Sequence, residues 1–236
     1  MERKVRSSRV IEVGTLFRGR YEVEAVLGRG GFGATYQVID RDALDRRKVL
    51  KELLPDREGD AKAQDLFERE ARILDRLDHP GIPRLDAFFV DDGRYYLVES
   101  FVQGQTLEAV LAKRSRLPEG EAIHIAEAVL KILKYLHELT PPVIHRDIKP
   151  SNLMVTEAGG YVLIDFGAVR EVLSVGTETV PDTTMIGSNG FTPPEQRVGQ
   201  AYPASDLYAL GATLVKLVTA KHPWHWYNAR EGPVGL

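Results

Sequence analysis

The sequence has no cysteine, so it cannot hold a disulfide framework or a cysteine-ligated zinc ion. No apolar run reaches the roughly 18 residues that a membrane-spanning helix needs. The opening MERKVRSSRV is basic but lacks the apolar core of a signal peptide. We expect residues 1–17 to form a flexible basic tail, with contact to a membrane surface as the alternative. These absences predict a cytoplasmic protein.

Neither sign of charge dominates, because 31 Lys and Arg stand against 34 Asp and Glu. A chain without a basic excess gives no reason to expect nucleic acid as a partner. Hydrophobic residues make up 43% of the chain, which is ordinary for a globular protein and allows a sizeable core. The length of 236 residues fits one large domain or two modest lobes.

The first hundred residues are predicted to be mostly strands with one helix. Residues 21–27 and 34–40 alternate in polarity around a glycine-rich turn, and residues 47–53 follow a polar turn. Residues 61–77 carry their apolar side chains on one stripe, which predicts an amphipathic helix. Residues 87–102 form a predicted hairpin around the turn DDGR.

Near Gly104 the pattern changes from strands to helices, which predicts a boundary between two lobes there. Residues 119–139 have the periodicity of a long amphipathic helix. Residues 153–164 form a predicted short hairpin that turns at a glycine pair. Residues 205–219 are apolar on nearly every side, which is typical of a fully buried helix.

The segment LGRGGFGATY contains Gly28, Gly30 and Gly33 in the pattern G-x-G-x-x-G. A helix directly after this motif would indicate a dinucleotide-binding fold. Predicted strands flank it on both sides instead, which favours a flap over phosphates. Glycine lets the backbone approach phosphate oxygens and donate N–H groups to them. A plain flexible hairpin turn is the alternative.

Two charged residues lie at positions where the pattern calls for apolar ones. Lys51 lies within an apolar strand, and Glu70 interrupts the apolar stripe of the predicted helix. A buried ammonium group needs a partner, so an ion pair between them would explain both positions. The alternative is a surface salt bridge worth under about 1 kcal/mol.

The segment VIHRDIKPSNLMV, residues 143–155, gathers charged side chains between two apolar runs. Asp147 could accept or orient a hydroxyl proton, and Lys149 could offset charge on phosphoryl oxygens. Asn152 and Asp165, which precedes Phe-Gly after a second apolar run, are oxygen ligands of the kind that Mg²⁺ prefers.

These motifs together resemble the eukaryotic-like (Hanks-type) protein kinases, most closely the bacterial serine/threonine class. The glycine loop, the strand lysine, HRDIKPSN, DFG and GSNGFTPPE occur in the family's order. The intervals also match, with 19 residues from Lys51 to Glu70 and 18 from Asp147 to Asp165. The resemblance covers about residues 18–225.

The resemblance implies an α+β, two-lobed kinase-like fold. The N-lobe, residues 18–102, would be a small antiparallel sheet with one helix, and residues 103–236 would form a mainly helical, shortened C-lobe. ATP with Mg²⁺ or Mn²⁺ is the implied cofactor pair. The implied substrates are Ser and Thr hydroxyls of proteins, including the chain's own activation loop.

The resemblance also assigns roles to single residues. Lys51 would hold the α- and β-phosphates, with Glu70 fixing Lys51. Asp147 would be the catalytic base, and Lys149 would contact the γ-phosphate. The residues implied for ATP binding are Gly28, Gly30, Gly33, Thr35, Val49, Lys51, Glu99, Phe101 and Leu153.

Metal binding and substrate positioning fall to other residues of the same motifs. Asn152 and Asp165 would hold the magnesium ion. Thr183 and Thr184 are the favoured phosphosites of the activation loop. Ser188 replaces the usual Thr of the peptide-binding loop and keeps its hydroxyl, which together with the lysine of HRDIKPSN favours Ser/Thr over Tyr specificity.

Besides Ser188, the sequence departs from the family's pattern at Thr35, where Val is usual, at Val49, where Ala is usual, at Glu99 and at its C-terminus. Glu99 is polar at the gatekeeper position, and the helices that usually follow do not appear before Leu236. The chain could be a fragment of a longer kinase, a short kinase covering its apolar patch with its own tail, or a chain covered by a second copy or partner. A nucleotide-binding, pseudokinase-like scaffold is therefore the alternative to an active kinase. A small-molecule phosphotransferase is a third reading, disfavoured by GSNGFTPPE.

Overall fold

The computed structural model of the chain describes residues 10–29, 33–53, 61–167, 170–171, 190–228 and 232–233. The chain divides into two compact units. The first consists of Met1–Asp78 with Pro83–Phe101, and the second of His79–Ile82 with Val102–Leu236. No helix in the described ranges is long and apolar enough to cross a membrane.

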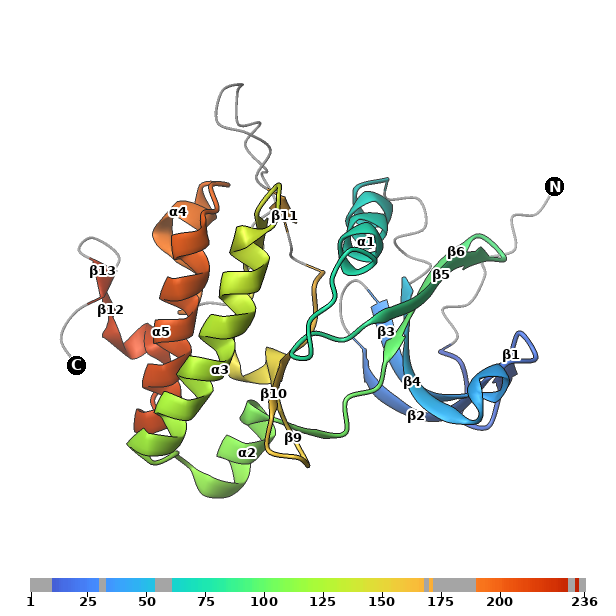
Figure 1. The fold of residues 1–236 in the computed structure, drawn as a ribbon, viewed down its shortest axis with the longest axis horizontal. Coiled ribbons are helices and arrows are strands. Elements are labelled where there is room, and N and C mark those ends of the chain that lie inside the picture. The colour runs from blue at the N-terminus through green and yellow to red at the C-terminus, as the bar shows by residue number, and fades with distance from the viewer. Residues whose placement is uncertain are drawn as a thin grey trace, which may run out of the picture. The chain divides into compact units, whose positions relative to one another are not determined.

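The described part of the first unit is an antiparallel sheet with one α-helix (Figure 1). The sheet order is β1-β2-β3-β4-β6-β5. Helix α1 ends at Leu74, three residues before the predicted end. The elements are β1 (Leu16–Phe17), β2 (Tyr21–Arg29), β3 (Gly33–Asp40), the 3₁₀ helix η1 (Arg41–Ala43), β4 (Arg46–Leu53), α1 (Ala61–Leu74), β5 (Leu85–Asp91) and β6 (Arg94–Ser100).

One face of this sheet carries a buried apolar core. Alternate residues of a strand point to the same face, which places Tyr36, Val38 and Leu50 together in this core. The N-terminal segment packs against them through Ile11, whose backbone N–H donates to the Tyr36 hydroxyl at 3.1 Å. Lys51 follows Leu50 in β4, so its side chain points to the opposite face.

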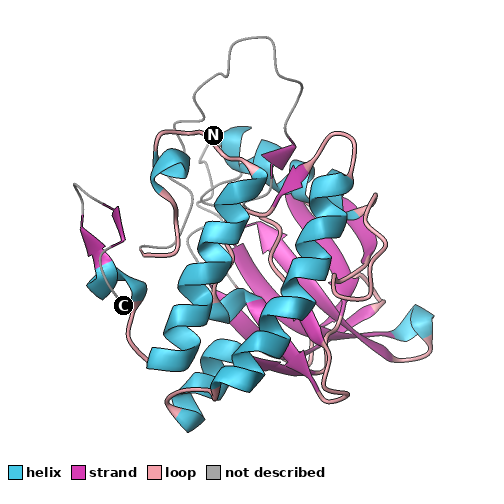
Figure 2. Cartoon of the chain, turned by 60° about the vertical axis from the view of Figure 1, so that its left-hand side comes forward, coloured by secondary structure: helices cyan, strands magenta, loops and turns pink. Residues whose placement is uncertain are grey.

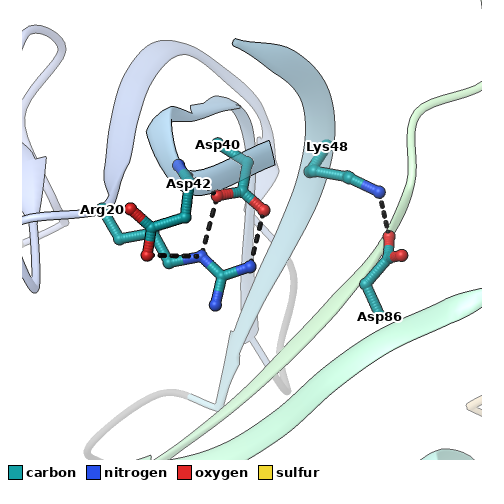
Figure 3. A network of polar contacts seen from close by, with 5 residues as sticks. All are labelled: Arg20, Asp40, Asp42, Lys48 and Asp86. Carbon is teal, nitrogen blue, oxygen red and sulfur yellow. Dashed lines mark hydrogen bonds and ion pairs between the residues drawn. The ribbon is translucent and has the colours of Figure 1, made fainter. Parts of the chain in front are cut away.

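Ion pairs tie the chain together near the ends of these strands (Figure 3). The Arg20 guanidinium makes a bidentate contact with Asp40, at 2.7 and 2.8 Å, and also lies 3.7 Å from Asp42. Lys48 on β4 pairs with Asp86 on β5 at 2.5 Å. Asp40 is almost completely buried, and its hydrogen bonds from Arg20 lower the pKa of its carboxyl although burial alone would raise it.

Replacing Arg20 with Gln should lower the free energy of unfolding at pH 7 by about 1–2 kcal/mol. The buried Asp40 carboxylate would lose its charged donor, although solvent reaches the guanidinium and moderates the effect. Because the pKa of Asp40 is lowered in the folded state, the stabilisation is present above the unfolded value near 3.9 and is lost as the pH falls through the folded value. Urea unfolding of both proteins at pH 7 and near pH 3 measures this difference.

The matched control is Arg41→Gln, since Arg41 pairs with the solvent-accessible carboxylates of Glu22 and Asp45. Its effect should be smaller than that of Arg20→Gln and should be reduced by salt. Equal effects of the two substitutions at pH 7 would contradict this account of Asp40.

The described part of the second unit is mainly helical, with short strand pairs (Figure 1). Strands β10, β9 and β7 form one sheet in that order, while β11 pairs with β8 and β12 with β13. The elements are β7 (Gly104–Thr106), α2 (Leu107–Arg114), α3 (Glu119–Glu138), β8 (Val143–Ile144), η3 (Pro150–Asn152), β9 (Leu153–Thr156), β10 (Tyr161–Leu163), β11 (Arg170–Glu171), α4 (Pro194–Arg197), α5 (Pro203–Thr219), η4 (Pro223–Trp226), β12 (Tyr227–Asn228) and β13 (Gly232–Pro233).

Helix α5 differs from its prediction. It begins earlier, at Pro203, and the expectation that it is buried on all sides is wrong. It packs beside α3 (Figure 2) and against β8, whereas Leu207 is 47% exposed. Its apolar composition could not show which of its sides would have neighbours. The buried face consists of Ser205, Asp206, Ala209, Leu210, Thr213 and Leu217.

Candidate active site

In the first unit, the Lys51 ammonium lies between two carboxylates. Its Nζ is 2.8 Å from Oε1 of Glu70 on α1 and 3.4 Å from Oε1 of Glu99 on β6. Only 14% of the Lys51 side chain and 6% of each glutamate side chain are exposed. The ion pair predicted between Lys51 and Glu70 is therefore present and largely buried. The second contact, with Glu99, was not predicted.

The register of the sheet explains why Glu99 reaches Lys51. Val49 lies opposite Glu99, and Lys51 lies opposite Leu97 in the antiparallel pair of β4 and β6. Lys51 and Glu99 are thus diagonal neighbours on one face, within reach for long side chains. Thr35 lies opposite Lys51 on the other neighbouring strand, β3.

The next residue of β4 anchors the strand from its other face. Glu52 is buried and accepts hydrogen bonds from the Tyr36 hydroxyl at 2.7 Å and from Arg94 at 2.9 Å. A Cβ atom at Gly33 would lie 2.5 Å from the Glu52 carbonyl oxygen, so this close approach of β3 to β4 requires glycine. These contacts fix the backbone beside Lys51.

In the second unit, three polar side chains of residues 147–152 form one cluster. Lys149 donates to Oδ2 of Asp147 at 2.7 Å. The Asn152 amide donates both to Oδ2 of Asp147 at 2.9 Å and to the Asp147 backbone carbonyl at 2.8 Å. The 3₁₀ turn η3 brings Asn152 back toward Asp147. The carboxylate of Asp147 is thus oriented by two donors.

Asp206 on α5 anchors the backbone that leads into this cluster. It is fully buried and accepts hydrogen bonds from the backbone N–H groups of His145 and Arg146 at 2.9 and 2.8 Å. The His137 ring lies 2.8 Å from the same carboxylate. Buried backbone N–H groups need acceptors, so Asp206 fixes the path of the loop.

The sequence profile of the protein kinase domain matches residues 21–232. The chain belongs to the protein kinase family. Its antiparallel-sheet unit and its mainly helical unit are the α+β kinase fold that the sequence predicted.

Curated kinases from bacteria are similar to this chain over most of its length. It is 42% identical to serine/threonine-protein kinase F of Synechocystis sp. over 232 residues, which cover 91% of this chain and 46% of that protein. It is 39% identical to serine/threonine-protein kinase PknA of Nostoc sp. over 241 residues, or 92% of this chain and 42% of PknA. For serine/threonine-protein kinase PrkC of Bacillus subtilis, the identity is 33% over 218 residues, 92% of this chain and 33% of PrkC. The chain thus spans less than half the length of these relatives.

Two residues of the kinase motifs hold strained backbone conformations. Arg146 and Asp165 have φ values of 71° and 67°, in the left-handed region that residues other than glycine rarely adopt. Such strain persists only where surrounding contacts impose it. At Arg146 these contacts include the hydrogen bond from its N–H to Asp206 and one from the Gln196 side chain to its carbonyl at 2.7 Å.

His145, the first residue of the HRDIKPSN motif, is fully buried. Its ring meets the Phe166 ring edge to face, with centroids 4.8 Å apart. Burial lowers the pKa of His145, while the nearby carboxylates, Asp206 first among them, oppose that shift. A buried histidine in this position joins the catalytic-loop motif to the Asp-Phe-Gly motif by packing.

The kinase's candidate metal ligands have suitable chemistry for magnesium. The Asn152 amide nitrogen donates to the side chain and to the backbone carbonyl of Asp147, which leaves its carboxamide oxygen on the other side of the amide group. Asp165 supplies an exposed carboxylate. Within the described ranges, no three His, Asp or Glu side chains gather into a cage for a metal ion. Two protein oxygens are enough for Mg²⁺, which commonly keeps water and phosphate ligands beside one or two protein groups.

The structure describes some of the remaining predicted site residues but not others. In the first unit, Gly28 lies opposite Thr35, Val49 lies opposite Glu99, and Phe101 follows β6. In the second unit, Leu153 is fully buried at the start of β9. Gly30, Thr183, Thr184 and Ser188 lie outside the described residues.

Glu195, the last residue of the motif GSNGFTPPE, has a partner that the sequence did not predict. Its carboxylate accepts a hydrogen bond from the Ser205 hydroxyl at 2.7 Å. The same hydroxyl accepts from the backbone N–H of Tyr202 at the start of α5. Ser205 therefore links helix α4, through Glu195, to the first turn of α5.

Proposed function

We propose that the chain is a serine/threonine protein kinase that transfers the γ-phosphate of Mg-ATP to protein hydroxyl groups, including those of its own activation segment. The observation that carries the proposal is the hydrogen-bonded cluster of Asp147, Lys149 and Asn152, anchored through the backbone to Asp206. Phosphoryl transfer depends mainly on positioning and charge stabilisation, and this cluster supplies both.

Asp147 acts as the base in the proposed reaction. Its carboxylate accepts the proton of a substrate Ser or Thr hydroxyl as that oxygen bonds to the γ-phosphorus. The bond from the γ-phosphorus to the bridging oxygen breaks, and ADP leaves with that oxygen. Lys149, already 2.7 Å from Asp147, offsets negative charge on the transferred group.

The proposal also assigns the residues that bind the nucleotide. Lys51, fixed by Glu70, binds the α- and β-phosphates. Asn152 and Asp165 hold Mg²⁺, which supplies positive charge that stabilises the phosphates. The other residues proposed to bind ATP are Gly28, Gly30, Gly33, Thr35, Val49, Glu99, Phe101 and Leu153.

The proposed acceptors are Ser and Thr. Support comes from the lysine at position 149, two residues after Asp147, and from the hydroxyl of Ser188. Thr183 and Thr184 are the proposed sites of self-phosphorylation, where a phosphate could pair with a basic side chain such as Arg146.

Incubation of the chain with γ-labelled Mg-ATP, followed by mass spectrometry, tests this proposal. We expect label on Thr183 or Thr184 that is absent from a Lys51→Met variant. A folded sample that binds ATP but gains no label, alone or with an added protein substrate, would argue for a nucleotide-binding scaffold instead.

Replacing Asn152 with Ala should raise the Mg²⁺ concentration needed for half-maximal phosphate transfer by about tenfold, because a metal ligand is lost. A Mg²⁺ titration at constant ATP measures the effect. Ser151→Ala changes the neighbouring residue of η3 and should leave the titration within about twofold of the wild type. An Asn152→Ala titration that overlays the wild type would remove Asn152 from the proposed metal site.

A further inference from the structure

We infer that Glu99 restrains the kinase's affinity for nucleotide phosphates by acting on Lys51. Besides its proposed place among the ATP-binding residues, Glu99 is thus a positioning residue that sets affinity through Lys51. The inference rests on the proposed function, in which Lys51 holds the α- and β-phosphates. It goes beyond that function because it assigns a second, opposing counter-ion to this lysine.

The geometry places the two counter-ions on different elements. Glu70 comes from helix α1, whereas Glu99 comes from β6, the direct hydrogen-bonded neighbour of β4. Glu99 is only 5% exposed, and the preceding residues Leu97 and Val98 are fully buried. The Glu99 carboxylate is therefore held 3.4 Å from Lys51 by the pairing of β4 and β6, not by α1.

Lys51 has two carboxylates beside it, at 2.8 and 3.4 Å. One ammonium lies beside two carboxylates, which leaves the three groups with a net charge of about −1 when all are ionised. A lysine ammonium has three donors, and Glu70 and Glu99 compete for them with any incoming phosphate. In a largely buried site, water screens the attraction between Glu99 and Lys51 less than it would in bulk solvent, so this contact weakens what Lys51 offers a phosphate.

Removing the charge of Glu99 should therefore strengthen phosphate binding. Glu99→Gln keeps the size of the side chain and an oxygen acceptor but removes the negative charge. We expect ADP and ATP to bind about tenfold more tightly to this variant. Adenosine has no phosphate, so its affinity should stay within about twofold of the wild type.

The experiment measures dissociation constants of adenosine, ADP and ATP by titration calorimetry at fixed Mg²⁺ and ionic strength. The proteins are the wild type, Glu99→Gln, Lys51→Met and the double variant. If Glu99 acts through Lys51, the tightening seen in Glu99→Gln should disappear in the Lys51→Met background. Glu24→Gln removes the same charge from β2, where Glu24 pairs with Arg47, and should change affinity less than twofold.

The outcomes separate this inference from the proposed function. A wild type that binds no nucleotide would overturn both. Overturning the inference alone requires that the wild type binds ATP, that Lys51→Met weakens binding, and that Glu99→Gln leaves ADP and ATP binding unchanged or weaker. Equal tightening of adenosine would also overturn it, because Glu99 would then act on the base.

A second variant keeps the test decisive if Glu99→Gln fails to fold. Glu99→Asp retains the charge but draws it back from Lys51 by one methylene. It should tighten ADP and ATP binding by about two- to threefold, again without changing adenosine binding. Weaker ADP binding in this variant would contradict the inference.

Discussion

Replacing Asp147 with Asn should reduce phosphate transfer by at least about 10²- to 10⁴-fold, because the side chain can no longer accept the hydroxyl proton. ATP binding should stay within about threefold of the wild type. Lys149 and Asn152 both donate to the same oxygen of Asp147, and the Asn carbonyl oxygen can accept from both, so the loop keeps these contacts. Initial rates of transfer and ATP dissociation constants, measured on the same samples, give both quantities.

The control for this prediction separates loss of chemistry from loss of binding. Lys51→Met should weaken ATP binding as well as transfer, because it removes the proposed phosphate ligand. Asp45→Asn, on the surface of the first unit, should change neither. If Asp147→Asn retained more than about a tenth of wild-type transfer, Asp147 would not be the base.

The second large effect is expected at Asp206, where Ala should lower the free energy of unfolding by about 3–5 kcal/mol. The substitution leaves the backbone N–H groups of His145 and Arg146 buried without their acceptor, and each such group costs about 1–3 kcal/mol. The contact with His137 is lost as well. Since domains are stable by only about 5–15 kcal/mol, a large share of the total stability would be lost.

Urea unfolding at neutral pH measures the effect of Asp206→Ala on stability. Rates of phosphate transfer, measured on the folded fraction, show whether the loop of residues 145–152 still holds its active arrangement. Asp206→Asn is the matched variant, because its one oxygen can accept from one of the two N–H groups. It should lose less stability than Ala while still slowing transfer. An Ala variant as stable as the wild type would contradict the anchoring role of Asp206.

The sequence predicted those parts of the site that depend on local spacing. The catalytic-loop cluster lies within six residues, from Asp147 to Asn152, and its members contact one another in the structure. The pair of Lys51 and Glu70 was predicted because each charge interrupts an apolar pattern of its own element. The prediction of the cluster rested on the residue types of the HRDIKPSN motif and its resemblance to the kinases. The prediction of the pair rested on the periodicity of one strand and one helix and on the requirement that buried charges be paired.

The contacts that escaped prediction depend on which strands become neighbours. Glu99 meets Lys51 because β6 pairs with β4 in a register that nothing in the local sequence fixes. The same holds for Glu52, whose donors Tyr36 and Arg94 come from two other strands. The sequence did contain a signal for this contact, because Glu99 is a charged residue directly after the mostly apolar run YYLV. Its partner could not be identified before the sheet order was known.

The sequence also did not predict how much of helix α5 is buried. The composition of α5 predicted a helix covered on every side, yet Leu207 is exposed and only one face is buried. Apolar composition shows that a helix can be buried, whereas the faces that are actually buried depend on the positions of α3 and β8. The polar residue Asp206 marks the functional face of this helix more clearly than its apolar residues do.

Transfer of labelled phosphate from Mg-ATP to an added protein, with the acceptor amino acids identified after hydrolysis, tests the central claim most directly. The wild type, Lys51→Met and Asp147→Asn should be compared on samples shown to be folded. The account predicts phosphoserine and phosphothreonine from the wild type and neither above background from the two variants. Equal labelling by all three proteins, or no labelling by a wild type that binds ATP, would contradict it.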